Sequence, residues 1–255
     1  MSSVTLSVHD RIATITLDNV GKLNALTPDM LVELSRHCDA IECDTSVVCV
    51  ILAAAGDRFF CAGADINEWA DLSPQEFARY WVRSGHRVFD RIARLSRPTI
   101  AVLHGNAFGG GLELASACDM RVMATSAQIA LPETGVGIVP GWSGTQRLAR
   151  LLPEPVLKEM ALFGRRLSAD RALALGFVAD VSVDPMAAAL AVAERLKDTS
   201  PAATEIAKYM IHAAVGEDRD GMIEALGSGM IAASADKQEG IAAFRAKRKP
   251  IFSGE

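Results

Sequence analysis

The sequence predicts an α/β core followed by a helical C-terminal region. Short apolar runs of strand length alternate with amphipathic runs of helix length along the first part of the chain, and beyond residues 185–200 only helical, alanine-rich runs remain. The 255 residues, half of them hydrophobic, are enough for an ordered core. We therefore expect a core over residues 1–190 that carries the functional site and a helical region over 191–255, as one integrated unit rather than two independent domains.

The N-terminal part of the chain alternates between strand and helix signals. Alternating apolar and polar residues over Val4–Val8 and Ile12–Leu17 indicate a β-hairpin. Thr27-Pro28 is an N-cap followed by a proline at the first helical position, so a helix is expected over 29–42. The capping-box pattern Ser73-Pro74-Gln75-Glu76 begins a second helix, which should run to about Leu95. Further strands are expected over 47–52, 99–103, 120–123 and 128–131, and further helices near 142–151, 153–163, 168–175, 185–198, 200–215, 217–233 and 236–248.

Composition and charge argue against several classes of protein. The formal net charge is −5, whereas a general nucleic-acid binder is usually basic. The five cysteines are odd in number and lie mostly in apolar or helical runs, so we expect reduced thiols in a cytoplasmic protein rather than a disulfide framework. The first residues show no signal-peptide pattern, and no apolar run approaches the length of a membrane-spanning helix. The sequence therefore predicts neither a nucleic-acid partner nor a membrane.

Three consecutive glycines, Gly109 to Gly111, lie between the strand predicted over 99–103 and a helix-like run that begins at Leu112. No side chain covers their backbone N–H groups at this helix N-terminus, where the helix dipole favours negative charge. Glu113, two residues further on, places a proton-transfer group beside this anion site. For the triplet alone two interpretations stay open: an anion-binding site, or a tight turn that needs glycine only for packing.

A second stretch with uncovered amides is Phe60-Cys-Ala-Gly-Ala-Asp-Ile66, in which small residues surround a glycine. By itself it is typical of an ordinary loop, but two such stretches in one chain are what an oxyanion hole requires, since the hole needs two convergent donors. Glu133 follows Leu131-Pro132 in an apolar, glycine-rich neighbourhood. Burial there would raise its pKa and let it hold a proton to donate, although a single glutamate after a proline turn is more often a surface residue.

Three other patterns do not meet their requirements. Gly141-Trp-Ser-Gly-Thr145 lacks the second glycine of the G-x-S-x-G nucleophile elbow. The glycine triplet lacks the third glycine of a dinucleotide-binding fingerprint, because residue 114 is Leu114, and we expect no βαβ unit around it. The five histidines have no metal-binding spacing, and His104 is interpreted as a hydrogen-bonded structural histidine. No metal site is predicted.

In order along the chain, these stretches resemble the enoyl-CoA hydratase/isomerase (crotonase) superfamily, and most closely its enoyl-CoA hydratases. The resemblance covers nearly the whole chain and rests on Lys22-Leu-Asn-Ala-Leu26, Phe60-Cys-Ala-Gly-Ala-Asp-Ile66, His104-Gly-Asn-Ala-Phe-Gly-Gly-Gly-Leu-Glu113, Pro132-Glu133, Pro140-Gly-Trp-Ser-Gly-Thr-Gln-Arg147 and Gly240-Ile-Ala-Ala-Phe-Arg-Ala-Lys-Arg-Lys-Pro250. It implies a crotonase-like spiral of ββα units with a C-terminal helical trimerisation region. It also implies an acyl-CoA thioester substrate, no redox cofactor or metal, and a homotrimer or a hexamer built as a dimer of trimers.

The resemblance further implies that the chain adds water across the 2,3-double bond of a trans-2-enoyl-CoA to give a 3-hydroxyacyl-CoA. The backbone N–H groups of Ala64 and Gly110 would hold the thioester oxygen. Glu113 would activate the water that attacks C3, Glu133 would protonate C2, and the backbone of Gly141 would also face the water. Contacts to CoA would come from Lys22, Leu23, Ala25, Ala62, Asp65 and Ile66, and from Phe244 and Lys247 of a neighbouring subunit.

Two departures from the family pattern bear on the substrate. Asp18-Asn19-Val20 stands where relatives often carry Asn-Arg-Pro, which weakens any inference about nucleotide contacts there. Trp142 and Ser143 stand where short-chain hydratases commonly have small residues. Walls of the acyl pocket are expected from Trp81, Phe108 and Trp142, so a generic straight-chain substrate does not follow from the resemblance.

Two alternatives stay open at this point. An enoyl-CoA Δ3-Δ2 isomerase, or another reaction of a thioester enolate on the same fold, needs only one carboxylate and could retain both; the pair Glu113 and Glu133 favours hydration. Some relatives combine hydratase activity with RNA binding, which a net charge of −5 and basic residues mostly near one end do not favour.

Overall fold

The computed structural model of the chain describes residues 2–255, and for residues 219 and 220 the backbone alone. The chain divides into two compact units, a first that ends at Thr204 and a second, Glu205–Glu255. The division after residue 190 into an integrated core and helical region stays a prediction.

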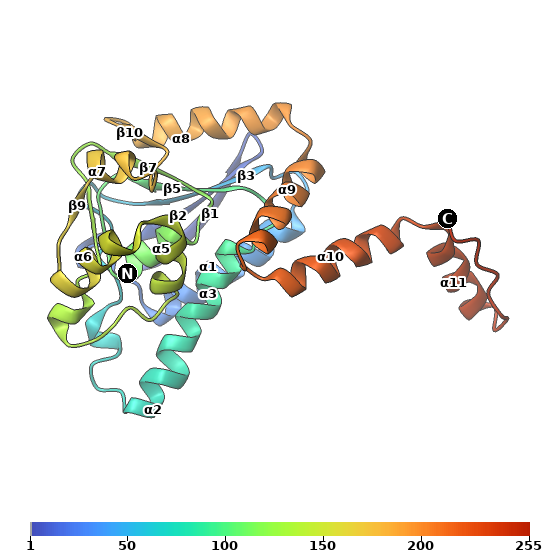
Figure 1. Ribbon diagram of the computed structural model, residues 1–255, viewed down its shortest axis with the longest axis horizontal. Coiled ribbons are helices and arrows are strands. Elements are labelled where there is room, and N and C mark those ends of the chain that lie inside the picture. Colours follow the sequence, from blue (N-terminus) through green and yellow to red (C-terminus); the bar gives the residue numbers. More distant parts are fainter. Residues whose placement is uncertain (1) are drawn as a thin grey trace. The chain divides into compact units, whose positions relative to one another are not determined.

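Two sheets form the centre of the first unit (Figure 1). The larger sheet has the strand order β1-β2-β3-β5-β7-β10, and the smaller sheet has the order β4-β6-β8-β9. The strands of the larger sheet are β1 (Ser3–His9), β2 (Ile12–Asp18), β3 (Cys49–Ala54), β5 (Thr99–Leu103), β7 (Met120–Ala124) and β10 (Asp180–Ser182). Those of the smaller sheet are β4 (Phe59–Cys61), β6 (Asn106–Phe108), β8 (Gln128–Ala130) and β9 (Leu167–Ser168).

The strand pairing confirms the predicted spiral of ββα units. β1 and β2 form the predicted antiparallel hairpin, and the remaining strands of the larger sheet pair in parallel. β4, β6 and β8 are also parallel, whereas β9 runs antiparallel to β8. Each successive pair, β3-β4, β5-β6 and β7-β8, gives one strand to each sheet before the chain enters a helix.

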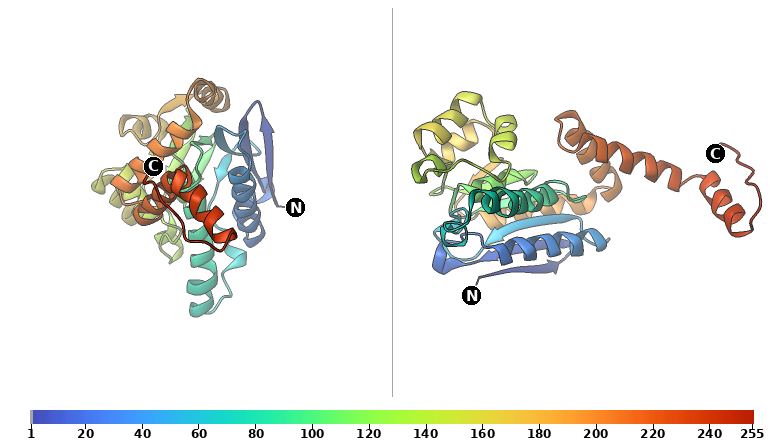
Figure 2. Two further views of the ribbon diagram at one scale, coloured as in Figure 1. Left: turned by 90° about the vertical axis from the view of Figure 1, so that its right-hand side faces the viewer. Right: turned by 90° about the horizontal axis from the view of Figure 1, so that it is seen from below.

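Helices cover both faces of the larger sheet. On one face lies α8, whose Ala189 and Ala193 pack against Ile51, Ile100 and Val122 (Figure 1). On the other face α1 and α3 lie side by side and bury residues such as Leu34 and Phe89 in the main core (Figure 2). The helices of this unit are α1 (Pro28–Cys43), α2 (Pro74–Glu76), α3 (Arg83–Ala93), α4 (Gly110–Ser116), α5 (Gly144–Leu151), α6 (Glu154–Phe163), α7 (Ala169–Ala174) and α8 (Pro185–Glu194), and α9 (Pro201–Ala214) runs across the division.

The predicted helix starts are confirmed, but one predicted helix is interrupted. The Thr27 side chain accepts a hydrogen bond from the N–H of Met30 at 3.3 Å, and Ser73 and Glu76 form a complete capping box. The helix expected from Ser73 to Leu95 contains a π-helical segment, Phe77–Val82, between α2 and α3. A π-helical turn takes more residues per turn than an α-helical one, which an apolar period in the sequence does not distinguish.

Four short strands were not expected from the sequence: β4, β6, β9 and β10. Each has two or three residues. A run of that length has no measurable period, and it becomes a strand only because a neighbouring strand pairs with it. β9 and β10 fall in the part of the chain after Gly141, where helices but no strands were expected.

The expectation that no βαβ unit surrounds the glycine triplet is wrong. β5 and β7 pair in parallel, and α4 lies between them in the sequence. The unit is not of the dinucleotide-binding kind, because β6 separates β5 from the glycines, whereas that fingerprint places its glycines directly after the strand. Leu114 still stands where the third glycine would be needed.

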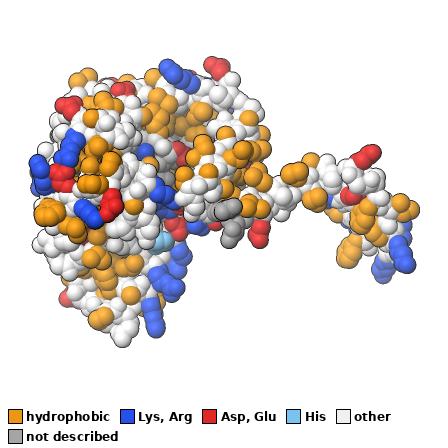
Figure 3. Space-filling model, in the orientation of Figure 1, with side chains coloured by type: hydrophobic (Ala, Val, Ile, Leu, Met, Phe, Trp, Pro, Cys, Tyr) orange, Lys and Arg blue, Asp and Glu red, His pale blue; other side chains and the backbone are white. Residues whose placement is uncertain are grey.

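The second unit consists of the end of α9, α10 (Arg219–Ala232), α11 (Ala235–Arg245) and a C-terminal tail. The tail folds back on α11, since Arg248 pairs with Glu239 at 2.6 Å and the N–H of Ile251 donates to the same carboxylate at 2.8 Å. Hydrophobic side chains are spread over the surface of this unit (Figure 3). Exposed members include Met210, Ile211, Val215, Ile223, Met230, Ile231, Phe244, Ile251 and Phe252. None of the described helices has the length and apolar character to cross a membrane.

Candidate active site

A cavity of about 200 Å³ in the first unit brings many of the predicted site residues together. Its two ionisable side chains are Glu113 and Glu133. Both glycine-containing stretches line it, through Ala62, Gly63, Ala64, Gly109 and Gly110, and so does Gly141. The other walls are apolar, from Ile66, Trp69, Phe77, Trp81, Val82, Pro132, Val136, Ile138, Val139 and Trp142. Two carboxyl groups in an otherwise apolar cavity are suited to moving protons out of reach of bulk water.

The two loops with uncovered amides meet at this cavity. A Cβ atom added at Gly110 would lie 3.5 Å from the nitrogen of Ala64, and one added at Gly63 would lie 3.4 Å from the nitrogen of Gly110. Leu26 fixes the first loop, because its N–H donates to Gly63 at 2.8 Å and its carbonyl accepts from the N–H of Asp65 at 2.9 Å. The arrangement therefore holds the amides of residues 64 and 110 close together beside one space.

At each position of the glycine triplet, a different physical constraint or role accounts for the residue. Gly109 has φ +52° and ψ −126°, which L side chains rarely adopt. A side chain at Gly111 would place its Cβ 2.2 Å from the carbonyl oxygen of Cys61, so α4 could not approach β4. Gly110 begins α4, where the N–H has no acceptor within the helix and stays available to a ligand.

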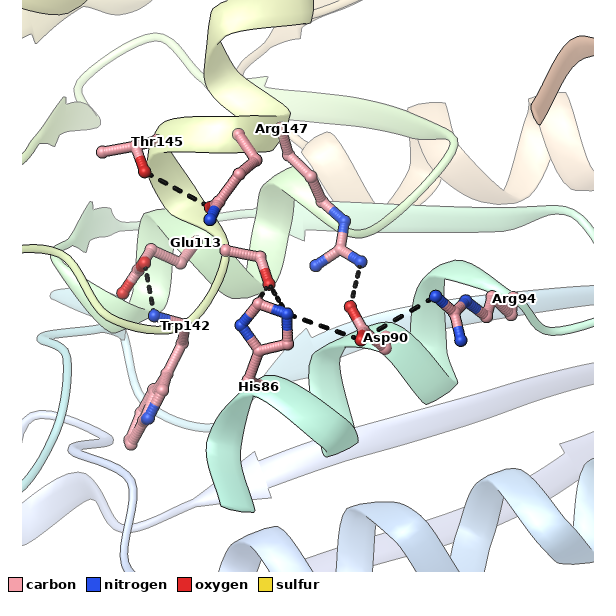
Figure 4. Close-up of polar contacts among 9 residues, drawn as sticks. His86, Asp90, Arg94, Glu113, Trp142, Thr145 and Arg147 are labelled. Atoms are coloured by element: carbon pink, nitrogen blue, oxygen red, sulfur yellow. Dashed lines mark hydrogen bonds and ion pairs between the residues drawn. The ribbon is translucent and has the colours of Figure 1, made fainter. Parts of the chain in front are cut away.

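Glu113 is a buried carboxylate that backbone amides hold from one side. It lies on α4 and is 3% exposed. One oxygen, Oε1, accepts a hydrogen bond from the N–H of Trp142 at 2.8 Å (Figure 4). The same oxygen accepts from the N–H of Gly144 at 2.7 Å. Burial raises the pKa of Glu113, while the amides of Gly144, Trp142 and Gly141 and the charge of Arg147 lower it. These donors stabilise the ionised form of Glu113.

Glu133 is also buried, but unlike Glu113 it lacks hydrogen-bond donors from neighbouring residues that the structure describes. It begins a short 3₁₀ turn after β8 and is 7% exposed, yet neither of its carboxyl oxygens has a hydrogen-bond partner among the other described residues. Burial raises its pKa to about 7; its own backbone amide opposes this shift, and the charge of Glu113 adds to it. Glu133 therefore holds a proton below about pH 7, and the amide donors favour placing the negative charge of the pair on Glu113.

Trp142 closes one side of the cavity. Its Nε1–H donates to the carbonyl of Trp81 in the π-helical segment at 3.3 Å. Its ring centroid lies 5.2 Å from that of Trp81 and 5.3 Å from that of Phe89. The indole lies on Gly85 of α3, where an added Cβ would come within 2.2 Å of it. Packing on several sides leaves this ring little freedom.

Other predicted site residues lie around the rim or apart from the cavity. Lys22 pairs with the buried carboxylate of Asp65 at 2.5 Å, and Asp65 also accepts from the N–H of Asn67 at 3.1 Å. Asp65 thus holds the turn that follows Ala64. Leu23 has a left-handed conformation with φ 55°, Ala25 is buried and Ile66 is half exposed.

Phe108 is not among the described residues that line the cavity. Its ring packs edge-to-face on Phe59 at 5.4 Å, and the Arg166 guanidinium lies over it at 4.9 Å. Phe244, in the second unit, is 85% exposed, and Lys247 follows α11 with φ 51°.

Several wall residues of the cavity and the backbone donors to Glu113 were not predicted from the sequence. Val136, Ile138 and Val139 line the cavity, and their signal was visible as apolar residues alternating with glycines after Glu133. Trp69 and Phe77 also line it and pack edge-to-face at 5.6 Å. Among the residues that the structure describes, no cluster of three or more His, Cys, Asp or Glu side chains could hold a metal ion.

The chain as a whole is similar to known proteins of one family. Residues 7–255 match the family described as enoyl-CoA hydratase/isomerase. A short-chain-enoyl-CoA hydratase of Clostridium acetobutylicum is 35% identical over 254 residues, which are 98% of this chain and 97% of the relative. A probable enoyl-CoA hydratase of Bacillus subtilis is 37% identical over the full length of both chains. The crystal structure of an enoyl-CoA hydratase from Bacillus anthracis superposes with a TM-score of 0.81 at 33% identity and covers 99% of both chains. The chain belongs to the enoyl-CoA hydratase/isomerase family.

Proposed function

We propose that this chain is an enoyl-CoA hydratase, which adds water across the 2,3-double bond of a trans-2-enoyl-CoA to give a 3-hydroxyacyl-CoA. The observation that carries the proposal is the pair of buried carboxyl groups in one cavity, one held as an anion by amides and the other without donors. Water addition needs such a pair, because one group must take a proton while the other gives one. The relatives named as hydratases support the same reaction.

The thioester oxygen is proposed to bind between the N–H groups of Ala64 and Gly110. Attack at C3 pushes electron density through C2 onto that oxygen, so two donors there stabilise the enolate more than the ground state. The removal of one donor from such a site typically costs about 100- to 1,000-fold in rate. The converging loops at Gly63 and Gly110 support this role.

The proposed proton transfers follow from the different surroundings of Glu113, which has amide donors, and Glu133, which has none among the other described residues. The ionised Glu113 takes a proton from water, whose oxygen forms the new bond to C3, and the backbone at Gly141 faces the same water. Protonated Glu133 gives its proton to C2, which completes the addition. The pair then holds the same total number of protons as before, since Glu113 has gained one and Glu133 has lost one, and a proton returns between them or through water. The reaction is redox-neutral and requires no redox cofactor.

CoA is proposed to lie along the rim formed by Lys22, Leu23, Ala25, Ala62, Asp65 and Ile66. The exposed ammonium of Lys22 supports a role toward phosphate groups, whereas the buried Asp65 carboxylate acts by holding Lys22 and the Ala64 turn. Phe244 and Lys247 are proposed to reach the CoA of a neighbouring subunit in a homotrimer or a hexamer of two trimers. The exposed apolar side chains of the second unit support such an assembly.

An enoyl-CoA isomerase is the main rival. It shuttles one proton between C2 and C4 and needs a single carboxyl group, so the presence of both Glu113 and Glu133 in the cavity favours hydration.

The test is an absorbance assay with crotonyl-CoA and a panel of longer, branched and aromatic enoyl-CoA thioesters. Hydration removes the conjugated double bond, so absorbance of the conjugated enoyl-thioester band is expected to fall, and chromatography is expected to show a 3-hydroxyacyl-CoA. If no thioester of the panel loses that absorbance while a 3-enoyl-CoA is converted into its conjugated isomer, the chain is an isomerase instead.

Trp142 is proposed to limit the size of the acyl group. In Trp142→Ala, kcat/KM for longer or bulkier enoyl thioesters is expected to rise about tenfold or more relative to crotonyl-CoA, since even one methylene in an apolar pocket can change this ratio about 10- to 200-fold. The variant is also expected to lose about 3–5 kcal/mol of stability, so its activity should be measured well below its melting temperature. Trp142→Phe, which keeps a ring in place, should retain the wild-type ratio. An unchanged ratio in both variants would show that the acyl group lies elsewhere.

A further inference from the structure

Four polar side chains join α3 to the start of α5 beside the candidate active site. His86 and Asp90 are one turn apart on α3, and Ser143 and Arg147 are one turn apart across the N-terminus of α5. Ser143 Oγ lies 3.0 Å from His86 Nδ1, His86 Nε2 lies 3.5 Å from Asp90 Oδ2, and Arg147 Nη2 donates to Asp90 Oδ1 at 2.6 Å (Figure 4). We call these four residues the His86 network.

Ser143 lies in a bend between the two residues whose backbone amides bind Glu113. It has φ +76° and ψ +10°, a left-handed conformation that costs free energy for any residue except glycine. The residues on either side of it, Trp142 and Gly144, supply the two N–H groups that converge on Glu113 Oε1. With Ser143 in this conformation the chain reverses, and both amides reach the same oxygen.

The Ser143 hydroxyl is not placed as a nucleophile, although serine, histidine and aspartate stand in a row. Ser143 is 5% exposed and, like His86, is absent from the described residues that line the cavity. Its hydroxyl contacts the imidazole instead. The contact therefore acts on the conformation of the bend rather than on a substrate.

We propose that His86 is a positioning residue that fixes Ser143 in its left-handed conformation and so aims the N–H groups of Trp142 and Gly144 at Glu113. Asp90, held in turn by Arg147 from the same helix that begins after Ser143, orients the imidazole. The inference rests on the proposed role of Glu113 in hydration. It follows that a glycine at 143, which adopts this conformation without strain, would make the hydroxyl–imidazole contact unnecessary.

The test is a double-mutant cycle between His86→Ala and Ser143→Gly, with hydration of the best enoyl-CoA as the readout. His86→Ala alone is expected to lower kcat about tenfold with little change in KM, because misaligned amides leave less of Glu113 in the ionised form that takes a proton from water, while the thioester contacts stay in place. Ser143→Gly alone should stay near wild type, and His86→Ala in the Ser143→Gly background should have almost no effect. Ser143→Ala, which keeps the strained conformation but loses the hydroxyl, should behave like His86→Ala.

Arg87→Ala is the matched control, because Arg87 is an exposed neighbour of His86 on α3 whose side chain bonds to Ser84. It should leave kcat unchanged. Thermal melting of each variant separates loss of fold from loss of kcat. Equal loss from His86→Ala in both backgrounds, or a Ser143→Ala variant with full kcat, would overturn the positioning role. If the wild-type chain hydrates no enoyl-CoA at all, the proposed function fails instead, and the two failures are distinguished.

Discussion

Glu133→Gln is expected to lower kcat for hydration about 100- to 10,000-fold, the range that a positioned general acid contributes. The amide is nearly the same size as the carboxyl group, but it has no proton acidic enough to give to C2. KM should change little, because the proposed oxyanion donors are backbone amides of Ala64 and Gly110. The fold should be retained, since neither oxygen of Glu133 holds another described residue in place.

The pH dependence gives a second signature of Glu133. Burial raises its pKa to about 7, so the fraction that carries a proton falls as the pH rises through that value. Wild-type kcat/KM for hydration should therefore decline above about pH 7, toward tenfold per pH unit, and the residual kcat/KM of Glu133→Gln should lack this decline. Glu154→Gln, an exposed glutamate paired with Lys158 on α6, is the matched control and should follow the wild-type profile. Hydration by Glu133→Gln at near-wild-type rates would remove Glu133 from the mechanism.

Glu113→Gln is the second change with a large expected effect, again about 100- to 10,000-fold in kcat. The glutamine keeps an oxygen that can accept from the N–H groups of Trp142 and Gly144, so the bend at Ser143 should survive. What is lost is the negative charge that takes a proton from water. The two glutamate variants should therefore look alike in steady-state hydration.

Exchange of the C2 proton with solvent deuterium distinguishes Glu113→Gln from Glu133→Gln. In deuterium oxide, a saturated acyl-CoA such as butyryl-CoA has no double bond to hydrate, but a base beside C2 can still exchange its proton while the oxyanion donors stabilise the enolate. This exchange should persist in Glu113→Gln and disappear in Glu133→Gln, as measured by mass spectrometry or NMR. The reverse pattern would mean that the two glutamates have exchanged roles.

The long elements of the fold could be predicted because each carries a local signal. The helix expected over 29–42 is α1, Pro28–Cys43, and its start is fixed by Thr27 and Pro28. The strand expected over 99–103 is β5 without change. In contrast, β4 and β6 form only because the spiral places them beside one another, and no pattern within three residues can report that.

In the site, too, residues with a local sequence signal could be predicted, and contacts between distant parts of the chain could not. The glycines and both glutamates could be singled out because each sits in an unusual local composition. The donors to Glu113 could not, since Trp142 lies 29 residues further along the chain and its contribution is a backbone N–H that every residue type except proline possesses. The contact between Ser143 and His86 spans 57 residues, and it exists only because the fold brings the N-terminus of α5 beside α3.

Gly85 and Trp142 have a consequence for how the acyl pocket can change. Because a Cβ at residue 85 and the indole at residue 142 claim the same volume, the two positions are epistatic. A side chain can be accommodated at 85 only after the tryptophan has been lost, and a tryptophan can enter at 142 only where 85 is already glycine. Libraries that vary residue 142 alone would therefore leave out every pocket shape that needs a side chain at residue 85, whereas joint libraries at 85 and 142 would include the combinations in which helix α3 itself becomes the pocket wall.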